Sequence, residues 1–138
     1  MKSLALCAAL TMAASTACAS SVSTFVGTGV AGFTDTQVAN PYGMIIGPDG
    51  AMYFCDLDNS RIRRLDLRTK KMTLIAGNGK KGYAGDGGPA TEASLAAPHE
   101  LVFDKKGDIY IAERDNHVIR KIDMKTGVIS TAAGTGMP

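Results

Sequence analysis

The sequence predicts an all-β protein built from repeated four-stranded units, the arrangement of β-propeller blades. The first observation is internal repetition: Pro41 recurs as Pro98 and Asp66 as Asp123, at one constant offset (98 − 41 = 57). The second is that short strand-like runs alternate with turn residues, and no segment has a helical period. A fixed period of this size indicates a repeat architecture. Four short strands per unit, with turns every few residues, are typical of one propeller blade.

The first 19 residues have the features of a secretory signal peptide. Lys2 gives a positive start, Leu4 to Ala14 is apolar, and small residues precede a predicted cleavage between Ala19 and Ser20. The apolar run is shorter than the ~20 residues that a membrane-spanning helix needs, so we expect no transmembrane helix. The predicted location is therefore secreted, periplasmic or cell-surface. A lipoprotein anchored through Cys18 is the minor alternative.

The repeat divides residues 20–138 into two units and part of a third. Unit one covers about 23–71, unit two about 72–127, and 128–138 reads as the start of unit three. Closed propellers typically need about four to eight blades. We therefore expect an incomplete ring, which self-association or further downstream blades would complete.

The second unit shows the expected strands and loops most clearly. Its strand-like runs are Met72 to Ala76, His99 to Asp104, Ile109 to Ala112 and Val118 to Asp123. A glycine-rich loop, Gly82 to Pro89, follows the first run. In the first unit, Ile62 and Leu65 would fall on opposite faces of a regular strand. Either a bulge or apolar contacts on both faces would explain this.

Composition excludes some classes of function. The chain carries a formal charge of +2, with 45% hydrophobic and 20% charged residues, which is a globular balance. A nucleic-acid-binding protein normally has a strongly basic face, so we predict no nucleic-acid partner. The basic residues of the strands have acidic neighbours and are expected to be solvated or paired: Arg61, Arg63, Arg64, Arg120 and Lys121. Cys55 lies in a strand-like run, and we expect a buried, inert thiol.

Two phrases of the second unit resemble the NHL-repeat family, especially the propellers of teneurin-type and bacterial cell-surface proteins. They are the run from Ala76 to Thr91, which contains Gly85-Asp86-Gly87-Gly88-Pro89, and the run from Gly107 to Asp123. The resemblance covers about Ser23 to Met137. It implies a β-propeller, often of six blades, and no single activity, because such propellers serve as binding modules, lyases, lactonases and scaffolds. The first unit departs from the pattern, since it lacks the glycine-rich loop and has Ser60 where the second has His117.

Two sets of residues are candidates for a site. Asp56, Asp58, Glu113 and Asp115 lie at matching turns and could supply oxygen ligands for Ca²⁺. Because both units carry them, a structural turn is the favoured interpretation. His99 and Glu100 are faint catalytic candidates: the resemblance extends to amidating lyases that use such histidines, and the first unit has Gly43 where the second has Glu100. A Zn²⁺ site normally needs three or four ligands, and the chain has only two histidines. We therefore predict no cofactor. A bound Ca²⁺ or Zn²⁺ ion is the alternative.

These observations favour a non-enzymatic binding or scaffold module, whose partner is a protein or a small extracellular ligand. The polar residues recur in both units, which indicates that they serve the fold. The alternative is part of a propeller enzyme, either a lactonase-like hydrolase or a metal-dependent lyase.

Overall fold

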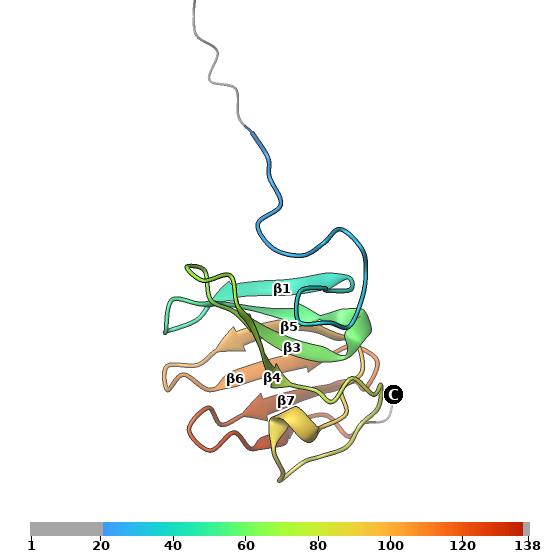
Figure 1. The fold of residues 1–138 in the computed structure, drawn as a ribbon. Helices are drawn as coiled ribbons and strands as arrows, with labels where there is room; N and C mark the ends of the chain where they lie inside the picture. The colour runs from blue at the N-terminus through green and yellow to red at the C-terminus, as the bar shows by residue number, and fades with distance from the viewer. Residues whose placement is uncertain (1–20, 137–138) are drawn as a thin grey trace, which may run out of the picture.

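The computed structural model describes residues 21–136, which form two four-stranded antiparallel sheets (Figure 1). This confirms the all-β prediction and the four strands per unit. The first sheet contains β1 (Pro41–Ile46), β2 (Met52–Asp56), β3 (Arg61–Leu65) and β4 (Met72–Ala76). The second contains β5 (Pro98–Phe103), β6 (Ile109–Glu113), β7 (Val118–Ile122) and β8 (Ile129–Ala133).

The sheets begin and end at different points from the sequence units. The run that opens unit two is β4, the last strand of the first sheet, and the run assigned to a third unit contains β8, the last strand of the second. The reason is local, because a tight turn at Asp66 to Lys71 returns the chain beside β3, with an Asp66 N–Lys71 O distance of 3.0 Å. After β4 the chain leaves the sheet in a long loop, residues 77–97. The predicted signal peptide, the Ala19–Ser20 cleavage site and Cys18 lie outside the described residues.

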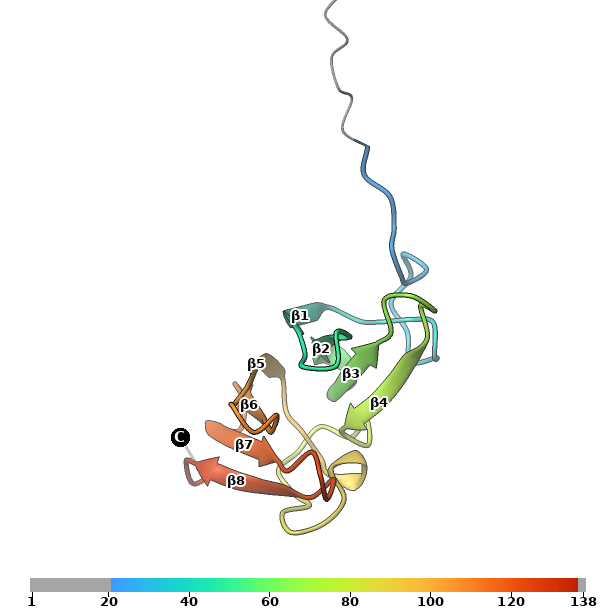
Figure 2. The same ribbon diagram turned by 90° about the vertical axis from the view of Figure 1, so that its left-hand side faces the viewer.

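The two sheets pack face to face around one apolar core. Tyr53, Cys55 and Ile62 of the first sheet and Ile109 and Ile111 of the second are buried in it. Figure 2 shows β1 and β5 close together, whereas β4 and β8 lie farther apart with the 77–97 loop between them. The pair therefore has the wedge shape of adjacent propeller blades. Alternating apolar residues direct one face of each strand into this core.

A second apolar cluster covers the opposite face of the first sheet. Phe54, Leu65 and Met72 are buried there, against Val26 and Val38 from the segment that precedes β1.

The sequence left open whether a bulge or apolar contacts on both faces explain the positions of Ile62 and Leu65 on β3. Ile62 lies in the core between the sheets, and Leu65 lies in the second cluster. The register of β3 against β4 also shifts between Ile62 and Arg63. A bulge and apolar contacts on both faces therefore occur together.

Cys55 has the buried environment that the sequence predicts. Burial, with a smaller contribution from the charge of Glu100, raises the pKa of this thiol to about 12. The thiol is therefore protonated at neutral pH and unreactive.

The helical content of residues 21–136 is limited to two short 3₁₀ turns, Leu57–Asn59 and Ala90–Glu92. In this part of the chain no helix is long and apolar enough to cross a membrane.

Candidate functional site

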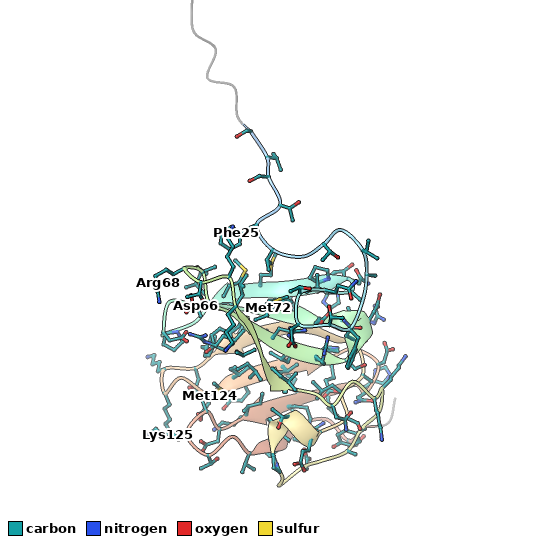
Figure 3. The ribbon with its side chains drawn as sticks, in the orientation of Figure 1. Phe25, Asp66, Arg68, Met72, Met124 and Lys125 are labelled. Carbon is teal, nitrogen blue, oxygen red and sulfur yellow. The ribbon has the colours of Figure 1, made fainter. Side chains whose placement is uncertain are left out.

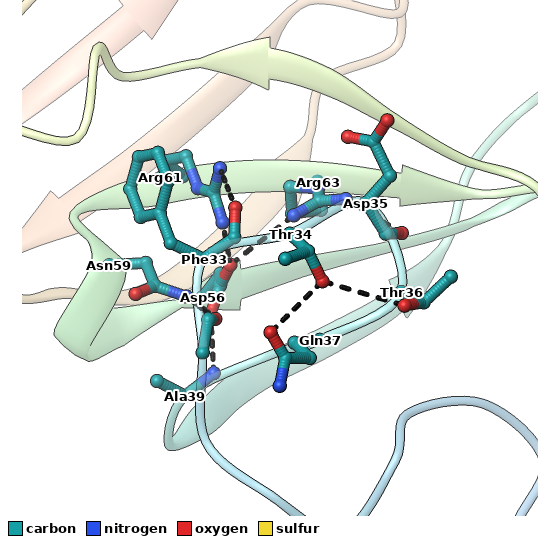
Figure 4. Close-up of polar contacts among 11 residues, drawn as sticks. Phe33, Thr34, Asp35, Thr36, Gln37, Ala39, Asp56, Asn59, Arg61 and Arg63 are labelled. Atoms are coloured by element: carbon teal, nitrogen blue, oxygen red, sulfur yellow. Dashed lines mark hydrogen bonds and ion pairs between the residues drawn. The ribbon is translucent and has the colours of Figure 1, made fainter.

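Asp56, a metal-ligand candidate, is completely buried at the end of β2 (Figure 4). Its Oδ2 accepts a hydrogen bond from Arg61 Nη2 at 3.0 Å and lies 3.6 Å from Arg63 Nη1. Its Oδ1 accepts hydrogen bonds from the backbone N–H of Ala39 at 2.8 Å and from Asn59 Nδ2 at 2.9 Å. Both carboxylate oxygens are therefore already bonded within the protein.

Glu113, the counterpart of Asp56, has the same kind of surroundings at the end of β6. Its Oε2 accepts from Ala96 N at 2.8 Å and from Asn116 Nδ2, and its Oε1 accepts from Arg120 Nη1 at 3.2 Å. Arg120 also reaches Asp86 Oδ1 at 2.6 Å. Burial raises the pKa of Glu113, and the Ala96 N–H and the Arg120 guanidinium offset part of that rise.

We call each of these acid–arginine–asparagine clusters a clasp, because it fastens a loop to the end of its sheet. Asn59 donates to Gly32 O at 2.7 Å, and Asn116 donates to Gly82 O at 2.8 Å. The Arg63 and Arg120 side chains are paired in the clasps and are only 2% and 0% exposed, whereas those of Arg64 and Lys121 are paired with Asp49 and Asp108 and are 27% and 31% exposed.

Aromatic rings of the same two loops cover the clasp arginines. The Arg61 guanidinium lies 3.7 Å from the Phe33 ring centroid, and that of Arg120 lies 5.3 Å from the Tyr83 centroid. Contacts at these distances stabilise a cation over a ring face. Sequence reasoning missed this arrangement, because the loop partners are distant in the chain.

The other two acidic candidates lie apart from the clasps. Asp58 accepts a 3.4 Å hydrogen bond from Asn40 Nδ2. Asp115 pairs with Lys81 at 2.7 Å and with Arg114 at 2.9 Å, and the hydrogen bond from Lys81 lowers its pKa. Within residues 21–136 no group of three or more His, Cys, Asp or Glu side chains is placed to hold a metal ion.

His99 and Glu100 lie on β5, where that strand approaches β1. The His99 ring contacts the Tyr42 ring, with centroids 4.5 Å apart, and its Nδ1 is 3.8 Å from Glu100 Oε1. Gly43 of β1 allows the approach, because a Cβ there would come within 2.5 Å of His99 O. The Glu100 side chain is 63% exposed.

A hollow of about 620 Å³ lies beside His99 on the second sheet. His117, Glu113 and Arg114 also line it, so the structure brings together two histidines that are distant in the sequence. Glu113 is already bonded in its clasp, and Glu100 lines a separate, smaller hollow of about 150 Å³. The two candidates His99 and Glu100 therefore line different hollows.

The residues around both hollows have counterparts 57 positions earlier in the sequence, and in the first sheet those counterparts are covered. We call it the open face, and it consists of Val102, Tyr110, Ala112, Ile119 and Ala133. Its counterparts in the first sheet lie in the core between the sheets: Ile45, Tyr53, Cys55, Ile62 and Ala76. Ile119 is 42% exposed, whereas Ile62 is 0% exposed. The second sheet thus carries an apolar surface like the one that the first buries.

Comparison with known proteins fits this repeat structure. The family model of the Teneurin NHL domain matches residues 66–137. Teneurin-1 of Gallus gallus is 33% identical over 114 residues, which cover 72% of this chain. The chain belongs to the teneurin-type NHL-repeat family. The family membership confirms the resemblance seen in the sequence.

Other relatives of this NHL-repeat chain include the chloroplastic protein SUPPRESSOR OF QUENCHING 1 of Arabidopsis thaliana, 34% identical over 67% of the chain. The chain spans 9% of that protein and 4% of Teneurin-1. A solved structure of a Bacteroides thetaiotaomicron protein of unknown function superposes with a TM-score of 0.61 at 27% identity, covering 69% of this chain and 24% of that one. A putative phosphatase from the same organism gives 0.52 at 28% identity, covering 67% and 22%.

Proposed function

We propose that this NHL-repeat chain is a non-enzymatic binding or scaffold module that acts outside the cell. The observation that carries the proposal is the open face of the second sheet, an apolar surface whose counterpart in the first sheet already packs against a protein surface. Exposed apolar patches of this kind mark interaction sites. Export rests on the signal-like segment of residues 1–19 and on the resemblance to cell-surface NHL proteins.

The candidate acidic groups support binding over catalysis. A general base needs a carboxylate or imidazole that can reach a substrate proton. The carboxylates of Asp56 and Glu113 each accept hydrogen bonds from an arginine, an asparagine and a backbone N–H. They hold loops in place, and the same roles recur in both sheets.

A second function is favoured by one observation, the shared hollow of His99 and His117. Two imidazoles on one surface could contribute to a metal-dependent lyase or a lactonase-like hydrolase. Such a site would still need a third ligand, which another blade of a larger ring would have to supply.

Export and binding are tested together on cells that produce the chain. We expect material recovered outside the cell to begin at Ser20, and labelled chain to bind those cells saturably, in competition with unlabelled chain. Intact Met1 in a cytoplasmic fraction would contradict export, and a lipidated Cys18 would replace the soluble form with an anchored one.

Catalysis is tested by measuring hydrolysis of a panel of lactones, and metal content, for the wild-type chain and a His99→Ala variant. The proposal predicts no turnover, with or without added Zn²⁺ or Ca²⁺, and unchanged cell binding by the variant. Metal-dependent turnover that is lost in His99→Ala would overturn the binding assignment in favour of the enzyme.

A further inference from the structure

We infer that the hairpin turns at one end of the two sheets bind a linear anionic polysaccharide. We call this surface the turn end. It consists of the turns at residues 47–51, 66–71, 104–108 and 123–128, together with Arg64 and Lys121 on the strands beside them. Figure 1 shows the four turns on the left-hand side of the molecule, away from most of the 77–97 loop. The turn end is distinct from the open face, so this inference goes beyond the binding surface proposed above.

The turn end carries a net positive charge, whereas the rest of the described chain is net negative. The turn end has 8 basic and 5 acidic residues, a formal charge of +3 (8 − 5), and the other residues of 21–136 have 6 and 8, a charge of −2 (6 − 8). A nearly neutral chain thus has a cationic end, which attracts anionic partners. The basic residues of the turn end are Arg64, Arg68, Lys70, Lys71, Lys105, Lys106, Lys121 and Lys125.

The five carboxylates of the turn end are bonded to groups of the turns and of the strands beside them. Asp66, Asp104 and Asp123 each accept two backbone hydrogen bonds within their own turns. Asp49 pairs with the strand residue Arg64 at 2.7 Å, and Asp108 pairs with Lys121 at 2.8 Å. These carboxylates therefore shape the turns, and among the described residues none of them forms an ion pair with a cation of the turns themselves.

The six cations within the turns are exposed. Lys70 Nζ lies 4.9 Å from the centroid of the Phe25 ring. The other five make no ion pair or side-chain hydrogen bond with another described residue: Arg68, Lys71, Lys105, Lys106 and Lys125. They can each contact an anionic group without first breaking a pair inside the protein.

A polyanionic chain fits the turn end better than a membrane does. A surface that lies on a membrane normally adds apolar side chains that enter the lipid. In the four turns the exposed large apolar side chains are Met124 and Val128, and each is only 36% exposed. The lysines and Arg68 instead offer charge-assisted hydrogen bonds, which suit sulfate and carboxylate groups spaced along a chain.

A polysaccharide also fits better than a nucleic acid. Proteins that bind single strands stack the bases on aromatic rings, and the four turns contain no aromatic residue. Proteins that bind a duplex neutralise many phosphates, whereas the turn end has a net charge of only +3 (8 − 5). The choice of a polysaccharide rests in addition on the proposed function, which places the chain outside the cell.

The test measures binding of the purified chain to immobilised heparin, which carries sulfate and carboxylate groups, at several salt concentrations. Wild-type chain should bind saturably, and its Kd should rise with salt, because salt screens exposed charges. The Kd of Lys105→Gln/Lys106→Gln should be about three- to tenfold higher, since exposed ionic contacts each contribute modestly. Lys80→Gln/Lys81→Gln is the matched control, because it removes another exposed lysine pair, in the 77–97 loop. It should bind like the wild type, and circular dichroism checks that both variants fold.

The pattern of losses decides between a specific surface and general attraction. Equal losses in the two lysine-pair variants, or no loss in Lys105→Gln/Lys106→Gln, would overturn the inference. Tighter binding to phosphatidylglycerol vesicles or to duplex DNA than to heparin would also overturn it. Wild-type chain that does not bind heparin but binds cells saturably would overturn it while leaving the proposed function intact. Heparin binding that is lost only in Lys105→Gln/Lys106→Gln, without saturable binding to cells, would support the turn end and contradict the proposed function.

Discussion

At the scale of single residues, the clasps explain why acidic residues recur at matching positions. Asp56 and Glu113 were candidates for metal binding, yet each is bonded to an arginine and an asparagine beneath a loop. Burying such charges is costly, and hydrogen bonds to the carboxylates offset part of that cost. Four arginine nitrogens of the clasps are buried without a hydrogen-bond partner: Arg61 Nε, Arg63 Nε, Arg63 Nη1 and Arg120 Nε. The clasps therefore contribute to the placement of the segment before β1 and of the 77–97 loop, and Leu95 of that loop packs in the core between the sheets.

Arg120→Ala is expected to be strongly destabilising. It leaves Glu113 buried without its cation, and removing one partner of a buried pair typically costs about 3–5 kcal/mol. The measurement is the free energy of unfolding in urea.

Arg114→Ala is the control for Arg120→Ala. Its side chain is 62% exposed and pairs with Asp115 at the surface, and exposed pairs contribute only about 0.2–1 kcal/mol. Equal losses in the two variants would show that the clasp does not hold the fold.

At the scale of strands and turns, the sequence predicted which segments are strands better than it predicted where each sheet begins and ends. Strand-like runs such as Ile109 to Ala112 are strands, and the turns fall where glycine and aspartate cluster. The first strand of each sheet could not be predicted, because a constant offset between repeated residues does not show where one sheet ends and the next begins. Only the hydrogen bonds of β4 to β3, made after the turn at Asp66, assign β4 to the first sheet.

The clasps, and the hollow shared by His99 and His117, could not be predicted from the sequence for a related reason. The loop partners of the clasps come from the segment before β1 and from the loop between the sheets, whose paths depend on tertiary contacts such as Asn59 to Gly32 O and Asn116 to Gly82 O. His99 and His117 meet at one hollow only because β5 and the turn before β7 end on the same side.

The turns that join the last two strands of each sheet predict the response to acid. Asp66 and Asp123 accept backbone hydrogen bonds from the residues that follow them, and these bonds lower the pKa of both carboxyls. Figure 3 shows the Asp66–Arg68 turn and the Met124–Lys125 turn on the same side of the molecule. A carboxyl whose pKa is lower in the folded state stabilises the protein above its unfolded pKa, and that contribution disappears as the pH falls.

We therefore expect the urea midpoint of unfolding to fall as the pH is lowered from 6 to below about 4, the ordinary pKa range of aspartate. The Asp66→Asn/Asp123→Asn variant should show a shallower fall, because amides cannot be protonated in this range. Glu113 acts in the opposite direction, since its pKa is raised. A variant whose midpoint fell as steeply as that of the wild type would show that these turns are not the source.

At the scale of the whole molecule, the two sheets share one apolar core, and the second sheet carries the apolar open face. Repeat proteins draw much of their stability from contacts between neighbouring units. The described residues contain one such contact, the core between the two sheets, and the open face is a second apolar surface of similar composition.

Saturable binding of the labelled chain to the cells that produce it tests this account most directly. Val102 and Ile119 of the open face are 55% and 42% exposed, and replacing them with lysine removes apolar area that a partner would cover. We predict saturable binding by the wild-type chain and loss of that binding in Val102→Lys/Ile119→Lys, with an unchanged circular dichroism spectrum. Equally strong binding by the wild type and by this variant would contradict the account.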